Sequence, residues 1–198
     1  MLSKRHRFFC LRIEKNASKS LRTLLRPYTS HVDSVMGGVK QISDRLAKFG
    51  ITEDEWLYNY YKFTFVRNPY KRIVSYYFHL YRRNGAIFRN IKGEFPSEET
   101  FLQFVKLFRP VRKRKFINQY DFLIDRRGMN PFDFIGKLET IERDIKRIEK
   151  KTGIKFKKIP HKNKTDYGDY RIYYNDESYE IVTRKFRKDI KNFRYKFE

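Results

Sequence analysis

A strand that passes directly into a helix is indicated by the stretch Phe63-Thr64-Phe65-Val66-Arg67-Asn68-Pro69-Tyr70. The run over Lys62–Val66 has the length and apolar character of a buried parallel strand. Asn68 is a favourable helix N-cap and Pro69 a favourable first helical residue, so we expect a helix that runs to about Arg83.

Two polar groups of this passage could bind an anion. Arg67 lies at the end of the expected strand, where a guanidinium can bind a phosphate through two hydrogen bonds. Ser75 follows in the helix and adds a hydroxyl. Taken alone, this pattern is also typical of a capped helix with an exposed arginine, so its interpretation depends on what lies beside it.

A second passage of the same kind lies earlier in the chain. We expect a strand over Arg7–Ile13 and a helix over Ser18–Arg26, which Pro27 ends. The turn between them is basic and polar: Lys15-Asn16-Ala17-Ser18-Lys19-Ser20. A helix N-terminus offers backbone N–H groups and the positive end of its dipole to an anion. A helix start that happens to be basic is the alternative interpretation.

Strands and helices alternate along the rest of the chain. We expect further helices over Val39–Phe49, between Ser97 and Pro110, and over Ile141–Thr152 and Asp176–Phe193, and further strands over Phe132–Leu138 and Lys155–Ile159. This order predicts an α/β fold with a mostly parallel central sheet flanked by helices, as a single domain over residues 1–198. Ligands of such sheets bind beyond the carboxyl ends of the strands, where both polar turns fall.

The composition indicates a folded and strongly basic protein. Hydrophobic residues make up 40% and aromatic residues 18% of the chain, which is enough for a packed core. The 46 Lys and Arg against 23 Asp and Glu give a net charge of +23, which attracts polyanions. Such a charge fits general nucleic-acid affinity, and it fits equally an anionic small ligand combined with an acidic polymer.

We expect neither a membrane span nor a disulfide. No apolar run reaches the roughly 18 residues that a membrane helix needs, and the first apolar run is too short for a signal peptide. The single cysteine excludes an internal disulfide and fits a reducing compartment. We therefore expect the cytoplasm, or the Golgi lumen if the chain is part of a longer eukaryotic protein.

The two turns together resemble the phosphate-binding motifs of sulfotransferases that use 3′-phosphoadenosine 5′-phosphosulfate (PAPS), of the carbohydrate type. The first turn is similar to the family's Lys-x-x-x-Thr-Ser motif for the 5′-phosphosulfate, although Lys19 stands where a threonine is usual. Phe63–Pro69 with Arg72 and Ser75 is similar to its motif for the 3′-phosphate. The resemblance implies a P-loop-NTPase-like fold, although the glycines of the Walker loop are absent.

The resemblance extends over nearly the whole chain. Phe134–Glu139 followed by Asp144 resembles the family's Gly-Arg-Phe-Glu stretch. Ile159–Thr165 resembles its Leu-Pro-His-x-Asn-Lys-Ser loop, and the segment from Tyr173 to Phe197 resembles its C-terminal helix and tail.

The resemblance also implies roles for individual residues. It makes the protein an enzyme that moves a sulfuryl group from PAPS to a hydroxyl of a carbohydrate or glycan by in-line transfer, without a metal. Lys15 would be catalytic, because it stabilises the leaving phosphate oxygen. The donor-binding residues that it implies are Lys15, Asn16, Ala17, Ser18, Lys19, Ser20, Arg67, Ser75, Asn163 and Lys164.

The acceptor hydroxyl needs a base, and the candidate is His31. It is the only histidine between the two phosphate motifs, and Asp33 nearby could orient its imidazole. A surface loop histidine is the alternative. His79 shares the helix face of Ser75, and we expect His161 to shape its own loop.

Two other functions stay open. A basic α/β module that binds nucleic acid without catalysis would explain the charge but not the paired turns. A nucleotide or sugar kinase of related fold would need the Walker glycines, which the first turn lacks. No specific nucleic-acid partner is expected from the sulfotransferase interpretation.

Overall fold

The computed structural model describes residues 1–30, 38–109, 117–157, 159 and 167–198. The chain divides into two compact units. The first unit comprises Met1–Arg67 and Gln119–Asn163, and the second comprises Asn68–Asn118 and Lys164–Glu198. The expectation of one domain over residues 1–198 stays a prediction.

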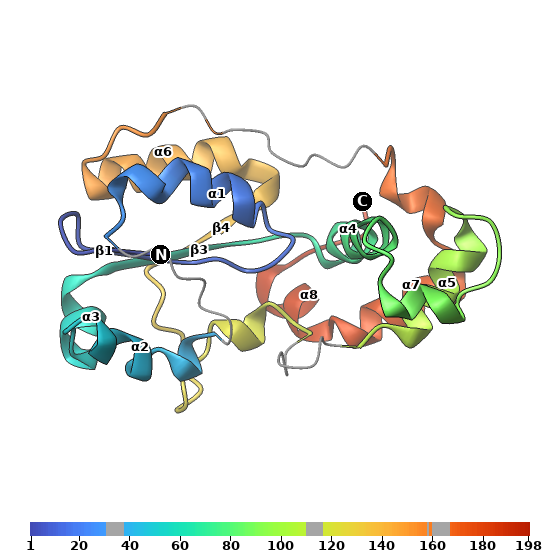
Figure 1. The fold of residues 1–198 in the computed structure, drawn as a ribbon, viewed down its shortest axis with the longest axis horizontal. Helices are drawn as coiled ribbons and strands as arrows, with labels where there is room; N and C mark the ends of the chain where they lie inside the picture. The colour runs from blue at the N-terminus through green and yellow to red at the C-terminus, as the bar shows by residue number, and fades with distance from the viewer. Residues whose placement is uncertain (31–37, 110–116, 158, 160–166) are drawn as a thin grey trace. The chain divides into compact units, whose positions relative to one another are not determined.

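The first unit is built on a four-stranded sheet in the order β1-β2-β3-β4 (Figure 1). The strands are β1 (Leu2–Ser3), β2 (Phe8–Leu11), β3 (Tyr61–Val66) and β4 (Phe134–Lys137). The pairs β2–β3 and β3–β4 are parallel, and only β1 runs antiparallel to its neighbour. The predicted mostly parallel sheet is therefore confirmed.

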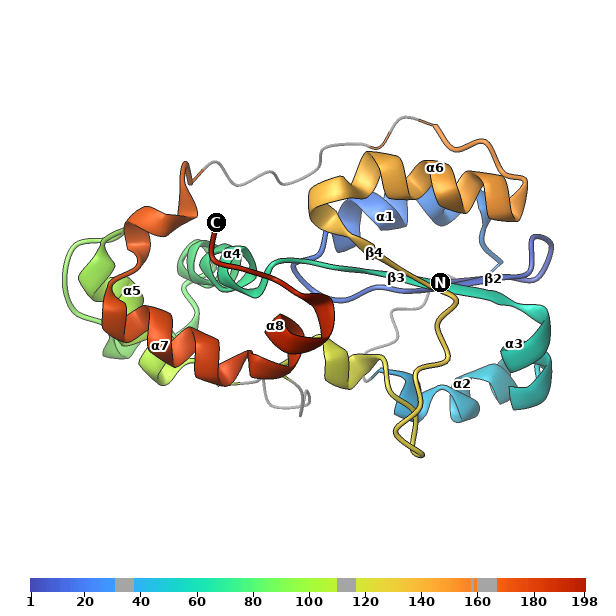
Figure 2. The same ribbon diagram turned by 180° about the vertical axis from the view of Figure 1, so that it is seen from behind.

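Helices cover both faces of this sheet (Figures 1 and 2). On one face lie α1 (Ser18–Leu25) and α6 (Ile141–Thr152), and on the other lie α2 (Ser43–Lys48) and α3 (Glu53–Asn59). Successive strand residues point to opposite faces, so Phe8 packs in the core with α1 and α6 while Phe9 contacts the ring of Trp56. A Cβ at Gly136 would lie 2.6 Å from the Phe65 ring, which explains the glycine in β4.

The second unit is helical and strongly aromatic. Its helices are α4 (Pro69–Tyr81), α5 (Glu98–Leu107), α7 (Asp176–Lys185) and α8 (Arg187–Phe193). Tyr77 is fully buried at its centre, with Phe95, Phe101 and Phe104 within ring-centroid distances of 4.7 to 5.4 Å. Short 3₁₀ helices complete the two units: η1 (Arg26–Tyr28), η2 (Val39–Gln41), η3 (Ala86–Asn90), η4 (Tyr120–Phe122), η5 (Leu138–Thr140) and η6 (Tyr170–Tyr173).

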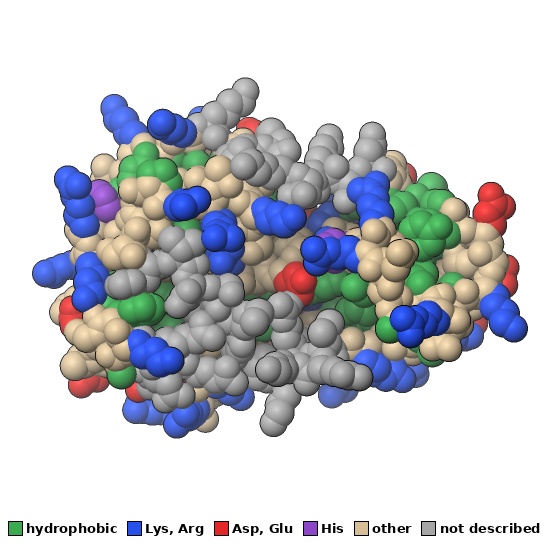
Figure 3. All heavy atoms as spheres, viewed as in Figure 1, with side chains coloured by type: hydrophobic (Ala, Val, Ile, Leu, Met, Phe, Trp, Pro, Cys, Tyr) green, Lys and Arg blue, Asp and Glu red, His purple; other side chains and the backbone are tan. Residues whose placement is uncertain are grey.

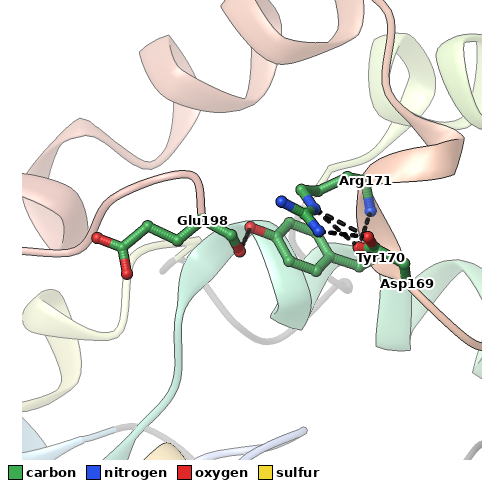
Figure 4. A network of polar contacts seen from close by, with 4 residues as sticks. All are labelled: Asp169, Tyr170, Arg171 and Glu198. Carbon is green, nitrogen blue, oxygen red and sulfur yellow. Dashed lines mark hydrogen bonds and ion pairs between the residues drawn. The ribbon is translucent and has the colours of Figure 1, made fainter.

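The C-terminal tail is fastened to the second unit by polar contacts (Figure 4). The Tyr170 hydroxyl donates to the backbone carbonyl of Glu198, beside the ion pair of Arg171 with Asp169 at 2.6 Å. Asn68, the N-cap of α4, donates to the carbonyl of Lys196 at 2.8 Å. The tail therefore binds directly to the residue that begins α4.

The expected single helix over Asp176–Phe193 is in fact two helices. In an unbroken helix, the N–H of Asp189 would donate to the carbonyl of Lys185. Instead, the side-chain amide of Asn118 inserts there, donating to the Lys185 carbonyl at 3.2 Å and accepting from the Asp189 N–H at 3.4 Å. A side chain inserted into the backbone ladder is a known cause of a helix break, and here it falls at Phe186.

The remaining differences are smaller. The expected helix over Val39–Phe49 begins as η2 before α2, and α3, capped by the Thr52 hydroxyl, was not predicted. The strand expected over Lys155–Ile159 is wrong, because residues 155–157 lie in no strand. Side chains take the backbone groups that a strand would use: Glu149 accepts from the Phe156 N–H, and the Tyr28 hydroxyl donates to the Lys155 carbonyl.

Candidate functional site

Both polar turns of the first unit lie at the same edge of the sheet. Since β2 and β3 are parallel, the turn that follows Leu11 and the residue that follows Val66 leave the sheet at the carboxyl ends of adjacent strands. The guanidinium of Arg67 donates from Nη1 to the carbonyl oxygen of Lys15 at 3.1 Å. The structure thus joins the two turns that the sequence presents separately.

The first turn has an unusual backbone. Lys15 and Ala17 have φ angles of 68° and 52°, in the left-handed region, and neither is a glycine. Such a conformation costs an L-residue about 1–2 kcal/mol. It persists only where surrounding contacts impose it, and it is common at ligand-binding loops.

Asn16, between these two residues, supplies the contacts. Its side chain is 1% exposed, and its Nδ2 donates to the carbonyl of Phe65 at 2.8 Å and to Oε1 of Gln119 at 2.6 Å. The Asn16 N–H also donates to the Ile13 carbonyl at 3.3 Å. The buried amide therefore ties the turn to the end of β3.

Gln119 is a site residue that sequence reasoning missed. It is fully buried; its Oε1 also accepts from the Arg67 N–H at 2.9 Å, and its Nε2 donates to the Arg67 carbonyl at 2.8 Å. Its partners lie 52 and 103 residues away in the chain. No local spacing or periodicity could have linked it to either turn.

The start of α1 is suited to an anion. Ala17 at the N-cap position makes no side-chain capping hydrogen bond, and the first turn of the helix contains no acidic residue. Arg12 adds a cation there, with Nη1 at 3.3 Å from the Ser18 carbonyl and 3.4 Å from its Oγ. Burial lowers the pKa of the Arg12 guanidinium, because its charge has lost part of its hydration, and a bound anion would compensate that loss.

The side chains of the first turn differ in exposure. Lys15 and Ser18 are half-buried and Lys19 is exposed, whereas Ser20 is buried at 4% exposure. Lys19, which replaces the usual threonine, therefore presents its charge to solvent at the beginning of α1. Elsewhere, Lys and Arg side chains are spread over the described part of the face in Figure 3 rather than gathered in one patch.

Ser75 belongs to the second unit. It lies in α4 and is 6% exposed, on the same helix as the buried Arg72. Arg72 donates to the Ile117 carbonyl at 3.0 Å and to the Tyr76 hydroxyl at 3.3 Å, so it links α4 to Ile117 within the second unit. His31, Asn163 and Lys164 lie outside the described residues, and all the predicted site roles stay predictions.

Neither a metal-binding cluster nor a membrane-spanning helix is found in the described part of the chain. Among these residues, no cluster of three or more His, Cys, Asp and Glu side chains is arranged to hold a metal ion. Within the same ranges, no helix combines the length and the apolar character needed to cross a membrane.

Comparison with known families agrees with this architecture. The model of the sulfotransferase family matches residues 1–196, which is nearly the whole chain. The protein therefore belongs to the sulfotransferase family, which implies a transferase that moves a sulfuryl group to an acceptor hydroxyl. No curated protein and no solved structure gives a significant match.

Proposed function

We propose that the protein transfers a sulfuryl group from PAPS to a hydroxyl of a carbohydrate or glycan. The observation that carries this proposal is the meeting of two cationic turns at one sheet edge, through the hydrogen bond from Arg67 to the Lys15 carbonyl. The first of these turns leads into α1, whose first helical turn contains no acidic residue and whose N-cap makes no side-chain hydrogen bond. Together they favour a ligand with phosphate-like groups at more than one position.

The residues of the first turn fit the phosphosulfate end of this donor. The α1 N-terminus, Lys15 and Lys19 provide N–H groups and positive charge, and Ser18 provides a hydroxyl that is half-buried beside Arg12. The turn lacks the Walker glycines, and its left-handed positions are taken by Lys15 and Ala17 instead. These features support a P-loop-like donor site.

In this proposal each cation has a separate role. PAPS, when bound, supplies a sulfuryl group attached to a phosphate leaving group. The ammonium of Lys15 neutralises the charge that grows on the leaving oxygen, which lowers the barrier of an in-line transfer. Arg67 holds the 3′-phosphate. Ser75, Asn163 and Lys164 are assigned to the nucleotide, and His31 to the acceptor proton, by resemblance to the family motifs alone.

Calorimetric titration with 3′-phosphoadenosine 5′-phosphate, the desulfated nucleotide, tests the donor. We expect binding by the wild type, and Arg67→Ala should weaken it by about 2 kcal/mol, as for a hydrogen bond to a charged group. Arg83→Ala is the matched control, because it removes one exposed arginine outside both turns. Absence of binding by the folded wild type, or an equal loss in both variants, would refute the proposed donor.

Transfer of labelled sulfate across a panel of glycans tests the acceptor and the catalytic groups. Lys15→Ala should abolish transfer, and His31→Ala should lower kcat while leaving nucleotide affinity unchanged. Labelling only of non-carbohydrate hydroxyls would contradict the acceptor class. Full turnover by Lys15→Ala would remove Lys15 from the chemistry.

A further inference from the structure

The side chain of Gln119 makes the hydrogen bonds to the Arg67 backbone that a neighbouring strand would normally make. The ladder between β2 and β3 ends at the pair Leu11 and Thr64. Beyond it, the side chains of Gln119 and Asn16 bind the backbone of Arg67 and Phe65 in place of a neighbouring strand. Phe65 and Arg67 are two residues apart in extended chain and present these groups to the same side.

The orientation of this amide is fixed by its partners. The Arg67 N–H can only donate and the Arg67 carbonyl can only accept, so Oε1 and Nε2 of Gln119 each have one possible place. Oε1 must then receive the NH₂ group of Asn16. Gln119 and the Phe65 carbonyl, which can only accept, therefore determine together which way the Asn16 amide faces.

That orientation carries a cost. The remaining oxygen of Asn16, Oδ1, is buried and has no hydrogen-bond partner among the described residues. A buried acceptor without a partner is destabilising, and in native structures it calls for an explanation other than stability. Here the NH₂ group of Asn16 donates to both Phe65 and Gln119, and the neighbouring residues Lys15 and Ala17 have left-handed backbone conformations.

We propose that Gln119 is a positioning residue of the donor site. By bonding the Arg67 backbone and the Asn16 side chain together, it holds the Lys15–Ser18 turn and the base of the Arg67 side chain in the conformation that receives the anion. Gln119 acts through these residues and does not itself touch the donor. This inference rests on the proposed function for its ligand, but the pre-formed turn is a property of the protein without ligand.

The test is Gln119→Met, which keeps the side-chain length and removes the hydrogen bonds to the Arg67 backbone and to Asn16. In the unliganded protein, peptide-level hydrogen exchange should rise about tenfold or more over residues 12–21, since about 1.4 kcal/mol of lost local stability corresponds to a tenfold change. Exchange in β3 should stay near the wild-type rate. Affinity for 3′-phosphoadenosine 5′-phosphate should fall by a similar factor.

Gln103→Met is a matched control. The Gln103 side chain pairs with one backbone residue in the same way, accepting from the Lys92 N–H at 3.0 Å and donating to the Lys92 carbonyl at 2.7 Å. It lies in α5 of the second unit and should change neither exchange over residues 12–21 nor nucleotide affinity. An equal effect of both variants would refute a specific role for Gln119.

Asn16→Ala provides a second route if Gln119→Met does not fold. It breaks the same link from the other side and should raise exchange over residues 12–21 as well. In the double variant the combined effect should be smaller than the sum of the two single effects, because both changes remove the hydrogen bond between Asn16 and Gln119. Wild-type exchange over 12–21 in either folded single variant, or additive effects, would overturn the inference. Failure of the wild type to bind the nucleotide would refute the proposed donor instead, and the exchange measurement would still decide the role of Gln119.

Discussion

Replacing Asn16 by aspartate should destabilise the first unit in a way that depends on pH. The Asn16 Nδ2 faces two oxygens, the Phe65 carbonyl at 2.8 Å and Gln119 Oε1 at 2.6 Å. In Asn16→Asp an oxygen takes the place of that donor, and no rotation of the carboxylate restores it. The change keeps the shape of the side chain, so the loss reports on hydrogen bonding and charge alone.

The magnitude follows from the two lost bonds and the new buried charge. Each bond contributes about 1 kcal/mol, and burying an ion without a donor adds at least as much, so we expect a loss of about 3 kcal/mol at pH 7. The unfolded carboxyl has a pKa near 4, roughly its value in peptides. Burial beside two oxygens raises the pKa in the native state, because the protonated form can donate one bond.

The sign of the pH effect follows from these two pKa values. Between the unfolded and the raised native pKa, the native state binds more protons than the unfolded state, so the free energy of unfolding falls as pH rises. The deficit of Asn16→Asp relative to wild type should therefore be smaller near pH 4 than at pH 7. Asn16→Ala, which has no carboxyl, should show a deficit that does not change with pH.

Urea unfolding followed by tryptophan fluorescence measures this. Trp56 is the single tryptophan, is 2% exposed, and belongs to the first unit together with Asn16. A loss of less than about 1 kcal/mol at pH 7, the contribution of one ordinary hydrogen bond, would refute the argument. An Asn16→Asp deficit of equal size at both pH values would refute the argument that a buried negative charge causes part of the loss.

Three further predictions concern the rest of the structure. Burial raises the pKa of the Cys10 thiol from 9.0 to about 11, so the native protein should resist thiol reagents at pH 8 and react with them only when unfolded in urea. For the same reason its free energy of unfolding should fall as pH rises from 9.0 to about 11, and rapid labelling of the native protein would contradict the prediction. Asp133→Asn removes the ionic partner at 2.9 Å from the buried Lys62 ammonium and should cost about 1–2 kcal/mol in urea unfolding monitored by Trp56, since the half-exposed carboxylate is screened by solvent. An unchanged midpoint would show that the carbonyls of Leu57 and Tyr60, which also accept from this ammonium, suffice. Phe197→Ala removes a ring whose centroid lies within 5.4 Å of four tyrosine ring centroids, which should cost about 2 kcal/mol of local stability and speed proteolytic cleavage of the C-terminal tail about tenfold or more. Unchanged cleavage would show that the polar contacts alone hold the tail.

Local features of the fold were predictable because their causes lie close together in the chain. The helix over Ile141–Thr152 ends at Gly153 as expected, since Gly153 adopts the left-handed conformation that closes a helix. Asn68 and Pro69 begin α4 for equally local reasons. The break of the last helix at Phe186 was not predictable, because its cause is the side chain of Asn118, 67 residues away from Lys185.

The candidate site also has features that the sequence predicts and features that it does not. The basic turn before α1 and Arg67 after β3 could be recognised from residue type and spacing, and so could their place at the carboxyl ends of parallel strands. Their link through Asn16 and Gln119 could not, because each of these amides is an ordinary polar residue in its local sequence.

By itself, the amino-acid sequence predicts the parallel strands β2, β3 and β4, the helices α1, α4 and α6, the basic charge and the motifs that the sulfotransferase family shares, since each depends on residue type and short-range spacing. Only the tertiary structure decides that Arg67 bonds to the Lys15 carbonyl and that Gln119 binds Arg67 and Asn16 at once. Hydrogen bonds between residues far apart in the chain exist only when the sheet has brought their strand ends together. Burial then makes them decisive, because a buried polar group that loses its partner cannot turn to water instead.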